Sequence, residues 1–200
     1  MLKIGLFGGT FDPIHNGHLV IAEKTVSELG LDRVIFIPAG DPPHKTDKEV
    51  TPKSIRYQMT CLAASAFDWS DVSDFELERD TLSYSVDTVK HFRAAYPEDE
   101  LYFVIGADSF ADMPSWWHYR ELMSLCKIIV FSRPDTKKED YLKRFDGDEK
   151  PPRVFLIDNV HMDISSTQIR EMLGRGEDVS RLIPPAVNEY IKQHGLYRHH

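Results

Sequence analysis

Residues 8–18 read GGTFDPIHNGH and directly follow the apolar run Leu2–Phe7. This order predicts a strand, a glycine-rich turn and then an amphipathic helix, whose apolar positions at helical spacing are Leu19, Ala22, Val26 and Leu29. A helix N-terminus carries unpaired N–H groups and a partial positive charge, which together attract anions. Glycines let phosphate oxygens approach the backbone closely. The stretch therefore predicts a site for a polyphosphate.

Two histidines three residues apart, His15 and His18, add side-chain donors at the mouth of this helix. Other interpretations are a plain tight turn at the glycines, a metal site shared by both imidazoles, and two histidines bonded within the core. The chain has no GxxxxGK[ST] motif, and the turn lacks the GxGxxG spacing of dinucleotide folds. We favour nucleotide binding, because Thr10, Asp12 and Gly17 share the same turn.

The chain has 200 residues, of which 28% are charged and 42% apolar. These values fit one globular domain over residues 1–200, with a small helical part at about 165–195. Its apolar runs are too short to cross a bilayer, and the N-terminus has no signal-peptide pattern. Cys61 and Cys126 lie far apart in apolar surroundings, which predicts reduced core thiols and a cytoplasmic location.

The formal net charge is −8, from 32 acidic and 24 basic residues. This balance argues against nucleic acid and anionic membranes as partners. It leaves small phosphorylated ligands open, because a few focused positive groups can hold them. The oligomeric state stays open as well, a homo-oligomer included.

Strand-like runs alternate with helical patterns along the chain. The predicted strands are Lys3–Phe7, Arg33–Ile37, Val72–Glu76, Leu101–Ile105, Ile128–Phe131 and Val154–Ile157. Five later helices are predicted. The first has Thr51 as its cap and Pro52 at its first position and runs towards Phe67, and the fourth runs from the Ser165–Gln168 capping box to Gly174. The others cover Ser85–Ala95, Trp116–Leu125 and Pro185–Gln193. Alternation of this kind means parallel strands with right-handed crossovers. The fold class is therefore α/β, with a doubly wound parallel sheet.

Ligands of such sheets bind beyond the carboxyl ends of the strands, at the switch point. Each segment with chemically active residue types follows a predicted strand; the segments are GGTFDPIHNGH, PAGDPPHK, LSYSVDT, GADS, SRPD and ISSTQIR. Their gathering on one rim of the sheet predicts a nucleotide site there.

Two further segments can supply phosphate ligands. Ser165, Thr167 and Arg170 repeat the pattern of a helix N-terminus with polar side chains, and a guanidinium binds phosphate through two parallel bonds. Plain capping by Ser165 and a surface salt bridge of Arg170 are the alternatives. His44 and Lys45 lie in a proline-rich loop that suits a lid carrying a phosphate-binding cation, with an irregular loop as the alternative.

An aromatic surface for a flat ring is predicted at Trp116 and Trp117, which follow Pro114 just after GADS. Two tryptophans at a helix start are more often core residues, but beside Asp108 they suit an electron-poor ring such as a pyridinium. LSYSVDT places Tyr84 and Ser85 on the same rim, where backbone N–H groups can hold a carboxylate.

No nucleophile–base pair is evident, which fits a reaction driven by positioning and charge stabilisation. A phosphate monoester has a second pKa of about 6 and is therefore anionic near pH 7 without a general base. When such a phosphate attacks the α-phosphorus of ATP, pyrophosphate leaves. His15, His18, Lys45, Arg170 and a Mg²⁺ held through the substrate phosphates suit this reaction, with no protein ligand set for the metal.

The motifs GGTFDPIHNGH, PPHK, LSYSVDT, GADS and ISSTQIR, in that order, resemble the bacterial nicotinate-nucleotide adenylyltransferases from about residue 3 to residue 195. HxGH alone is shared across a superfamily. Together with ISSTxIR it narrows the resemblance to nucleotidyltransferases, and LSYSVDT with PSWW indicates the nicotinate branch. The family more often has Thr at Ser85 and Tyr at Trp117, which leaves backbone contacts unchanged. The resemblance implies a Rossmann-like nucleotidyltransferase fold and the synthesis of deamido-NAD from ATP and nicotinate mononucleotide in NAD biosynthesis.

The resemblance also implies a division of roles. In it the histidines and Arg170 bind the ATP phosphates, Gly106 and Asp108 lie by the sugars, and Trp116 stacks on the nicotinate ring. The full ATP-binding set is Gly8, Gly9, Thr10, Phe11, His15, Gly17, His18, Gly106, Asp108, Ser165, Thr167 and Arg170. The mononucleotide-binding set is Thr10, His44, Lys45, Tyr84, Ser85, Asp108, Trp116, Trp117 and Arg133.

Three alternatives are weaker. Phosphopantetheine adenylyltransferases share the first motif but usually have Thr at the position of His15, are shorter and lack ISSTxIR. An aminoacyl-tRNA synthetase fragment would need a KMSKS loop and an RNA-binding domain. A nucleotide sensor would bind ATP without turnover, which does not explain a complete set of phosphate-binding residues.

Overall fold

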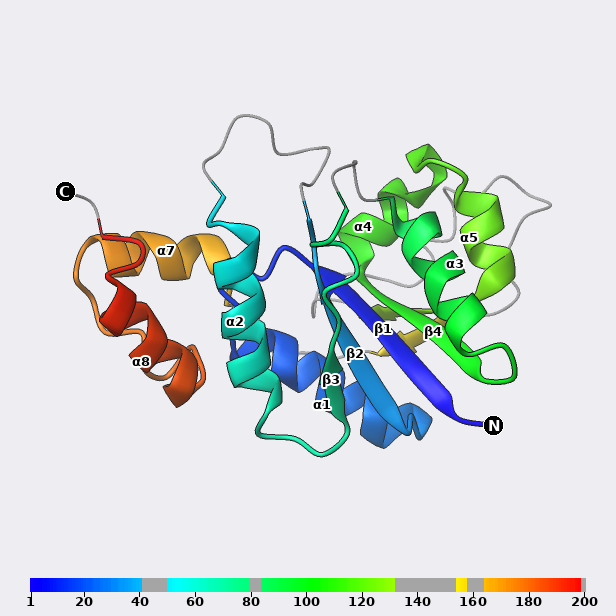
Figure 1. The fold of residues 1–200 in the computed structure, drawn as a ribbon, viewed down its shortest axis with the longest axis horizontal. Coiled ribbons are helices and arrows are strands. Elements are labelled where there is room, and N and C mark those ends of the chain that lie inside the picture. The colour runs from blue at the N-terminus through cyan, green and yellow to red at the C-terminus, as the bar shows by residue number, and fades with distance from the viewer. Residues whose placement is uncertain (41–49, 80–83, 132–153, 158–163, 199–200) are drawn as a thin grey trace.

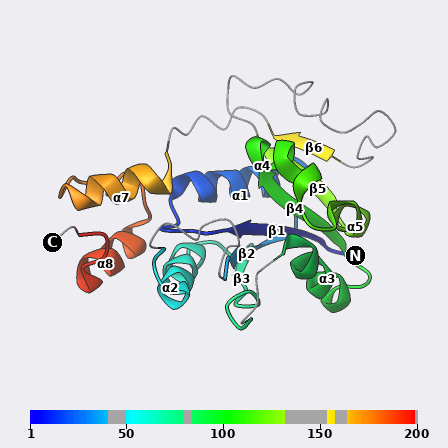
Figure 2. The ribbon, with the colours of Figure 1, turned by 90° about the horizontal axis from the view of Figure 1, so that it is seen from above.

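The computed structural model describes residues 1–40, 50–79, 84–131, 154–157 and 164–198. Within them one parallel sheet has the strand order β3-β2-β1-β4-β5-β6; Figure 1 shows β1 to β4, and Figure 2 shows all six strands. The strands are β1 (Lys3–Gly9), β2 (Arg33–Pro38), β3 (Ser70–Val72), β4 (Glu100–Gly106), β5 (Lys127–Phe131) and β6 (Val154–Ile157). The order runs outward from β1 to β3 and then restarts beside β1 at β4. This switch point confirms the predicted doubly wound sheet.

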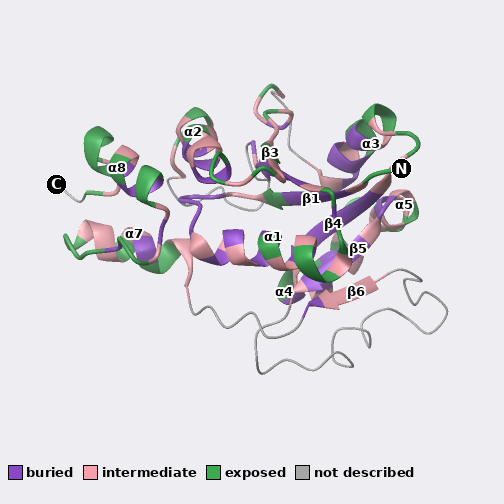
Figure 3. Ribbon diagram, turned by 90° about the horizontal axis from the view of Figure 1, so that it is seen from below, coloured by how far each residue is buried: buried purple, intermediate pink, exposed green. Residues whose placement is uncertain are grey.

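Helices cover both faces of the sheet. They are α1 (Asn16–Leu29), α2 (Lys53–Ala64), α3 (Ser85–Ala95), α4 (Ala107–Asp112), the 3₁₀ turn η1 (Met113–Ser115), α5 (Tyr119–Leu125), α7 (Ser166–Gly174) and α8 (Pro185–His194). Side chains of a strand alternate between faces, so Leu101 and Phe103 pack with α3 and α5, whereas Tyr102 and Val104 pack with α1 and α2. Figure 3 shows the buried segments along the strands and on the inward sides of the helices.

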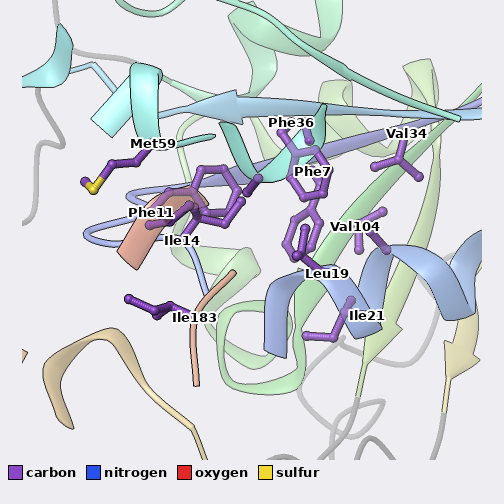
Figure 4. Close-up of a cluster of buried hydrophobic side chains, with 14 of the residues drawn as sticks. Phe7, Phe11, Ile14, Leu19, Ile21, Val34, Phe36, Met59, Val104 and Ile183 are labelled. Carbon is purple, nitrogen blue, oxygen red and sulfur yellow. The ribbon is translucent and has the colours of Figure 1, made fainter. Parts of the chain in front are cut away.

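The loop that follows β1, residues 10–15, is held in place by apolar side chains that pack in the core; we call it the site loop. Phe11 and Ile14 are buried, and Phe7 at the end of β1 stacks on Phe36 of β2 with centroids 5.6 Å apart (Figure 4). Ile183 from the C-terminal part joins the same cluster. The polar groups of the loop are therefore presented from a rigid base.

The C-terminal helices pack at the end of the molecule away from the N-terminus, with α8 beside α2 (Figures 1 and 2). Their buried apolar residues belong to the same core cluster as α1 and α2; they are Ile169, Val187 and Ile191. No helix among the described residues is long and apolar enough to cross a membrane.

One predicted strand is misplaced. Val72–Glu76 was expected to be extended, but β3 covers Ser70–Val72 and the chain turns directly afterwards. The N–H groups of Leu77 and Glu78 both donate to the carbonyl of Asp74, at 2.7 and 3.2 Å. The turn at Asp74 overrides the apolar pattern that predicted the longer strand.

Two helix starts also differ from the prediction. The helix expected from Trp116 begins only at Tyr119, because His118 has φ 53°, a left-handed conformation that interrupts a helix. α2 begins at Lys53 with Pro52 as its N-cap. Thr51, predicted to cap it, instead donates its N–H to Oδ2 of Asp12 at 3.3 Å.

Candidate active site

A cavity opens where β1 and β4 part. Their pairing ends at Phe7 and Val104, but β1 continues through Gly9 beside β2, and β4 continues to Gly106 beside β5. The gap widens into a cavity of about 350 Å³, a volume in the range of small-molecule sites. It lies at the predicted switch point, on the predicted rim.

The cavity wall combines residues of β1, β4 and β5 with residues of the loops and helices beyond the strands. Its predicted members are Gly8, Gly9, Thr10, Phe11, His18, Ser85, Gly106 and Trp116. Its members that sequence reasoning missed are Phe7, Ala39, Glu76, Thr88, Phe103, Val104, Ile105, Ser109 and Phe131. Most of these are strand residues, which sequence patterns marked only as core.

His18 is held in one orientation at the cavity wall. Its Nδ1 accepts the backbone N–H of His15 at 3.2 Å, which leaves the proton of the neutral ring on Nε2. The ring stacks on His15 with centroids 3.7 Å apart and meets the Phe11 ring edge-to-face at 5.0 Å. The imidazole is thus a fixed hydrogen-bond donor.

Both histidines are neutral at neutral pH. Burial lowers the pKa of His15 from 6.5 to about 4, and its side chain is 6% exposed. Burial, followed by the neighbouring His15, holds the pKa of His18 well below its usual value. Nδ1 of His15 is buried, and no hydrogen-bond partner for it exists among the described residues. An orphaned polar atom at a helix N-terminus suits a ligand that supplies the missing partner.

The two glycines of the turn have different reasons to be glycine. A Cβ at Gly9 would lie 2.7 Å from the Phe11 ring, so packing of the site loop excludes it. A Cβ at Gly8 would meet no atom within 4 Å, although Gly8 lines the cavity. Packing within the protein therefore does not require a glycine at this position. The open space next to the Gly8 backbone suits a ligand that approaches it closely.

The N-terminal ends of α1 and α7 meet at the site loop (Figure 2). The hydroxyl of Ser166 donates to the carbonyl of Pro13 at 3.0 Å, and Nη1 of Arg170 donates to the carbonyl of Asp12 at 2.7 Å. Nη2 of Arg170 reaches Oγ1 of Thr167 at 3.4 Å. Arg170 is therefore oriented towards the same loop as the histidines, as a phosphate role requires.

Capping explains part of the C-terminal motif. Oγ of Ser165 accepts the N–H of Gln168 at 3.2 Å, and the N–H of Ser165 donates to Oε1 of Gln168 at 3.0 Å. This reciprocal pair is the predicted capping box. Ser166 was missed, because in sequence it is one of two equivalent serines in the motif.

Arg56, also missed, ties three backbone segments together beneath the site. Its side chain is 1% exposed and donates to the carbonyls of Thr10 at 2.7 Å, Thr51 at 2.8 Å and Gly40 at 3.0 Å. A lone arginine in a helix carries no sequence signal for this role.

The far wall of the cavity is aromatic and polar. Trp116 lines it and meets Phe103 edge-to-face at 6.5 Å, whereas Trp117 is 63% exposed and lies 6.1 Å from the ring of Tyr84. Ser85, the first residue of α3, contributes that helix's N-terminus to the wall. An aromatic surface and the partial positive charge of a helix N-terminus thus belong to the same cavity wall.

A buried acid–hydroxyl pair joins this wall. The hydroxyl of Thr88 donates to Oε1 of Glu76 at 2.7 Å, which connects the turn after β3 to α3. Asp108 is exposed in the first turn of α4, and the wall takes Gly106 and Ser109 from that region instead. Gly17 is buried in the first turn of α1. The predicted site residues His44, Lys45 and Arg133 lie outside the described residues.

The thiols take no part in this site. Cys61 and Cys126 are both free, and burial raises the pKa of Cys126 to about 12. In the described ranges no group of three or more His, Cys, Asp or Glu side chains could hold a metal ion.

Comparisons with known proteins agree on one family. The cytidylyltransferase-like family model matches residues 6–172. A Clostridium tetani protein named "probable nicotinate-nucleotide adenylyltransferase" is 44% identical over 201 residues, which is 99% of this chain and 100% of that protein. A Desulfitobacterium hafniense protein of the same name is 42% identical over 198 residues, covering 98% of this chain and 96% of its own.

Solved structures share the fold. Plasmodium falciparum nicotinic acid mononucleotide adenylyltransferase complexed with NaAD aligns with a TM-score of 0.81 and 23% identity, over 98% of both chains. The same enzyme complexed with APC gives a TM-score of 0.78 at 22% identity, again over 98% of both chains. The family model covers most of this chain and relatives match its whole length, so the chain belongs to the nicotinate-nucleotide adenylyltransferase family of nucleotidyltransferases.

Proposed function

We propose that this enzyme transfers the adenylyl group of ATP to nicotinate mononucleotide, giving deamido-NAD and pyrophosphate in NAD biosynthesis. The observation that carries the proposal is the cavity between β1 and β4, whose wall combines the open backbone at Gly8, the fixed donor His18 and the aromatic Trp116. Relatives that match the whole chain bear the name of this activity. We treat the chain as one catalytic domain, because α7 and α8 share the core cluster of α1 and α2.

The reaction needs no covalent enzyme intermediate. A phosphate oxygen of the mononucleotide forms a new bond to the α-phosphorus of ATP. The bond from that phosphorus to the α,β-bridging oxygen breaks, and pyrophosphate leaves with the electron pair. The mononucleotide phosphate is already anionic near pH 7, since its second pKa is about 6, so no general base is required. Rate acceleration then comes from alignment and from stabilisation of the developing charge.

The phosphate-binding groups surround the site loop in this proposal. Neutral His18 donates from Nε2, and His15 supplies a second imidazole at the start of α1. Arg170, held against the Asp12 carbonyl, presents its remaining donors to the phosphates. Lys45 is assigned to the same group on the sequence motif alone. The remaining ATP contacts are proposed for Gly8, Gly9, Thr10, Phe11, Gly17, Gly106, Asp108, Ser165 and Thr167.

The mononucleotide occupies the aromatic end of the cavity. Trp116 stacks on the electron-poor nicotinate ring, and the N-terminus of α3 at Ser85 attracts its carboxylate. A carboxamide has nearly the same shape but no charge, so the helix end favours the acid. Thr10, His44, Lys45, Tyr84, Asp108, Trp117 and Arg133 complete the proposed mononucleotide site.

Magnesium enters with the substrate in this scheme. The described residues offer no cluster of metal-ligating side chains, and Mg²⁺ commonly binds through substrate phosphates. Its contribution when bound is to neutralise phosphate charge. The protein residues bind and orient the nucleotides around it.

The deciding experiment measures pyrophosphate release from Mg-ATP with three acceptors supplied separately: nicotinate mononucleotide, nicotinamide mononucleotide and phosphopantetheine. A strong preference for the acid mononucleotide supports the proposal. Release with phosphopantetheine alone would refute the assignment of the aromatic wall and keep the phosphate site. If calorimetry shows ATP binding but no acceptor gives pyrophosphate release, the protein would be a nucleotide sensor and not an adenylyltransferase.

A further inference from the structure

Tyr197, near the C-terminus, reaches the loop that carries the phosphate-binding groups. Its hydroxyl donates to Oδ1 of Asp12 at 2.6 Å. Asp12 is 4% exposed, its Oδ2 accepts the N–H of Thr51 at 3.3 Å, and its backbone carbonyl accepts Nη1 of Arg170 at 2.7 Å. Asp12, a buried residue, thus bonds both to Tyr197 through its side chain and to the Arg170 guanidinium through its backbone carbonyl.

The backbone before Tyr197 is arranged to deliver its side chain. α8 ends at His194 and is followed by the C-cap Gly195 with φ 61°, and the N–H of Leu196 donates to the carbonyl of Ile191 at 3.1 Å. Tyr197 itself has φ 64°, a left-handed conformation that costs a bulky residue free energy. Such a conformation persists where surrounding contacts impose it, and here the contacts are the core cluster and the Asp12 carboxylate.

The chemistry of the pair makes the bond important to the loop. A buried carboxylate needs donors, because its desolvation is costly when a partner is missing. Asp12 finds donors in Tyr197 and Thr51, which belong to different parts of the chain. Burial and the charge of Asp12 both raise the pKa of Tyr197, so the phenol stays a protonated donor at neutral pH.

We propose that Tyr197 is a positioning residue of the phosphate site: by holding the Asp12 carboxylate it holds the Asp12 carbonyl against which Arg170 is oriented. The inference rests on the proposed function, in which Arg170 binds the ATP phosphates. Displacement of a positioned group by about 1 Å can cost a hundredfold in rate. A hydroxyl at the end of the chain therefore controls a group of the site without contacting substrate.

The test compares two tyrosines of the C-terminal part. Tyr197→Phe removes one hydroxyl and keeps the ring. Tyr190→Phe is the matched control, because both tyrosines pack against the same core cluster, and no hydrogen bond of the Tyr190 hydroxyl is found within the described residues. The Tyr190 ring stacks on His194 at 4.0 Å. Both changes are made in the wild-type chain and in an Arg170→Lys chain, which lacks the forked guanidinium.

The readouts are kcat, the KM for ATP and the calorimetric ATP affinity, each at a temperature where thermal melting shows a folded protein. In the wild-type chain Tyr197→Phe should lower both kcat and ATP affinity by roughly tenfold or more. In the Arg170→Lys chain it should cost less than about twofold, because residues that act through one another are not additive. Tyr190→Phe should change neither quantity.

Two outcomes would overturn the proposal. The first is an unchanged kcat and ATP affinity in Tyr197→Phe, and the second is an equal loss in both backgrounds; each would reduce Tyr197 to an anchor of the chain end. If Tyr197→Phe fails to fold, Asp12→Asn changes the other member of the hydrogen-bonded pair. Its losses of kcat and ATP affinity in the wild-type and Arg170→Lys chains are then compared in the same way. Should wild type bind ATP but release no pyrophosphate, the proposed function fails, while the affinity measurements still judge Tyr197.

Discussion

The backbone N–H of His15 donates to Nδ1 of His18 at 3.2 Å, while the two imidazole rings stack with their centroids 3.7 Å apart and 23° between their planes. Imidazole lone pairs lie in the ring plane, so two stacked rings do not aim at one ion. The geometry therefore disfavours the metal-pair interpretation of the HxxH spacing and leaves His18 a donor from Nε2.

Replacing His18 should separate its structural role from its chemical one. α7 demonstrates that a Gln in this position can accept the N–H of the capping residue, as Gln168 does for Ser165. His18→Gln is therefore expected to keep the melting temperature. The amide N–H of the glutamine is attached to the same carbon as Oε1 and does not take the place of Nε2 across the imidazole ring, so kcat/KM should fall about a hundredfold, the scale of losing one transition-state donor. His18→Ala should lose both activity and stability. Near-normal kcat/KM in His18→Gln, measured by pyrophosphate release, would contradict the donor role.

The buried His15 should make stability fall on mild acidification. Its pKa is about 4 when folded and near 6.5 when unfolded, so between these values the unfolded chain binds more protons. Its stabilisation is complete above pH 6.5 and is lost as the pH falls towards 4, by about 3 kcal/mol in total. His15→Asn keeps a good N-cap residue and removes this titration. Between pH 8 and pH 4 the melting temperature of the wild type should therefore fall relative to that of His15→Asn. A difference between the two melting temperatures that stays constant with pH would contradict the prediction.

The sequence predicted the parts of the fold that depend on periodicity and capping. The parallel strands, the cap at Ser165 and the helix end at Gly195 follow from local patterns, and the structure has them. The turn at Asp74 and the left-handed His118 were missed, because each depends on hydrogen bonds or packing that an apolar pattern does not encode.

The candidate site divides in the same way. Residues with a chemical signature, such as His18, Ser85 and Trp116, were named and line the cavity. Asp12 was noticed only as a member of the turn, and Arg56 not at all. The bond from Arg56 to Thr10 and the bonds from Thr51 and Tyr197 to Asp12 each join residues about 40 or more positions apart. Long-range polar contacts of this kind leave no periodic trace in a sequence.

The adjacent glycines offer a matched pair of variants. Gly9→Ala should destabilise the protein by about 1–3 kcal/mol, because its Cβ would overlap the Phe11 ring. Gly8→Ala places a methyl group in open space at the cavity, so it should leave the melting temperature unchanged and weaken ATP affinity by roughly tenfold. Calorimetry and thermal melting on both variants check this. Equal ATP affinity in Gly8→Ala and wild type would remove Gly8 from the ligand site.

The neighbouring tryptophans should differ in the same assay. Trp116 lines the cavity, whereas the side chain of Trp117 is largely exposed. Trp116→Ala is expected to raise the KM for nicotinate mononucleotide roughly tenfold or more, on the scale of a lost stacking and cation–π contact, and to leave the KM for ATP nearly unchanged. Trp117→Ala keeps its backbone N–H and should change either KM by less than about twofold. An unchanged mononucleotide KM in Trp116→Ala would rule out the stacking role.

Arg56 should be among the residues on which folding and activity both depend. It is buried, and its guanidinium donates to the carbonyls of Thr10, Thr51 and Gly40. Hydrogen bonds from a charged group contribute about 1.5–3 kcal/mol each, and carbonyls left unpaired in the interior add a further cost. Arg56→Met is therefore expected to lower the free energy of unfolding by about 3 kcal/mol or more, measured by urea denaturation.

The control for Arg56 is Arg33→Met, which removes an arginine from an exposed salt bridge with Asp71 at 2.9 Å. Exposed pairs contribute about 0–1 kcal/mol, so this variant should unfold almost like wild type. Arg56→Lys keeps the charge but not the forked donors, and should lie closer to Arg56→Met than to wild type. Because Thr10 belongs to the cavity wall, both Arg56 variants should also lose kcat at temperatures where they are folded. Equal stability of Arg56→Met and Arg33→Met would mean that the three carbonyls find other partners, and that the Arg56 guanidinium is not what holds Thr10 in place.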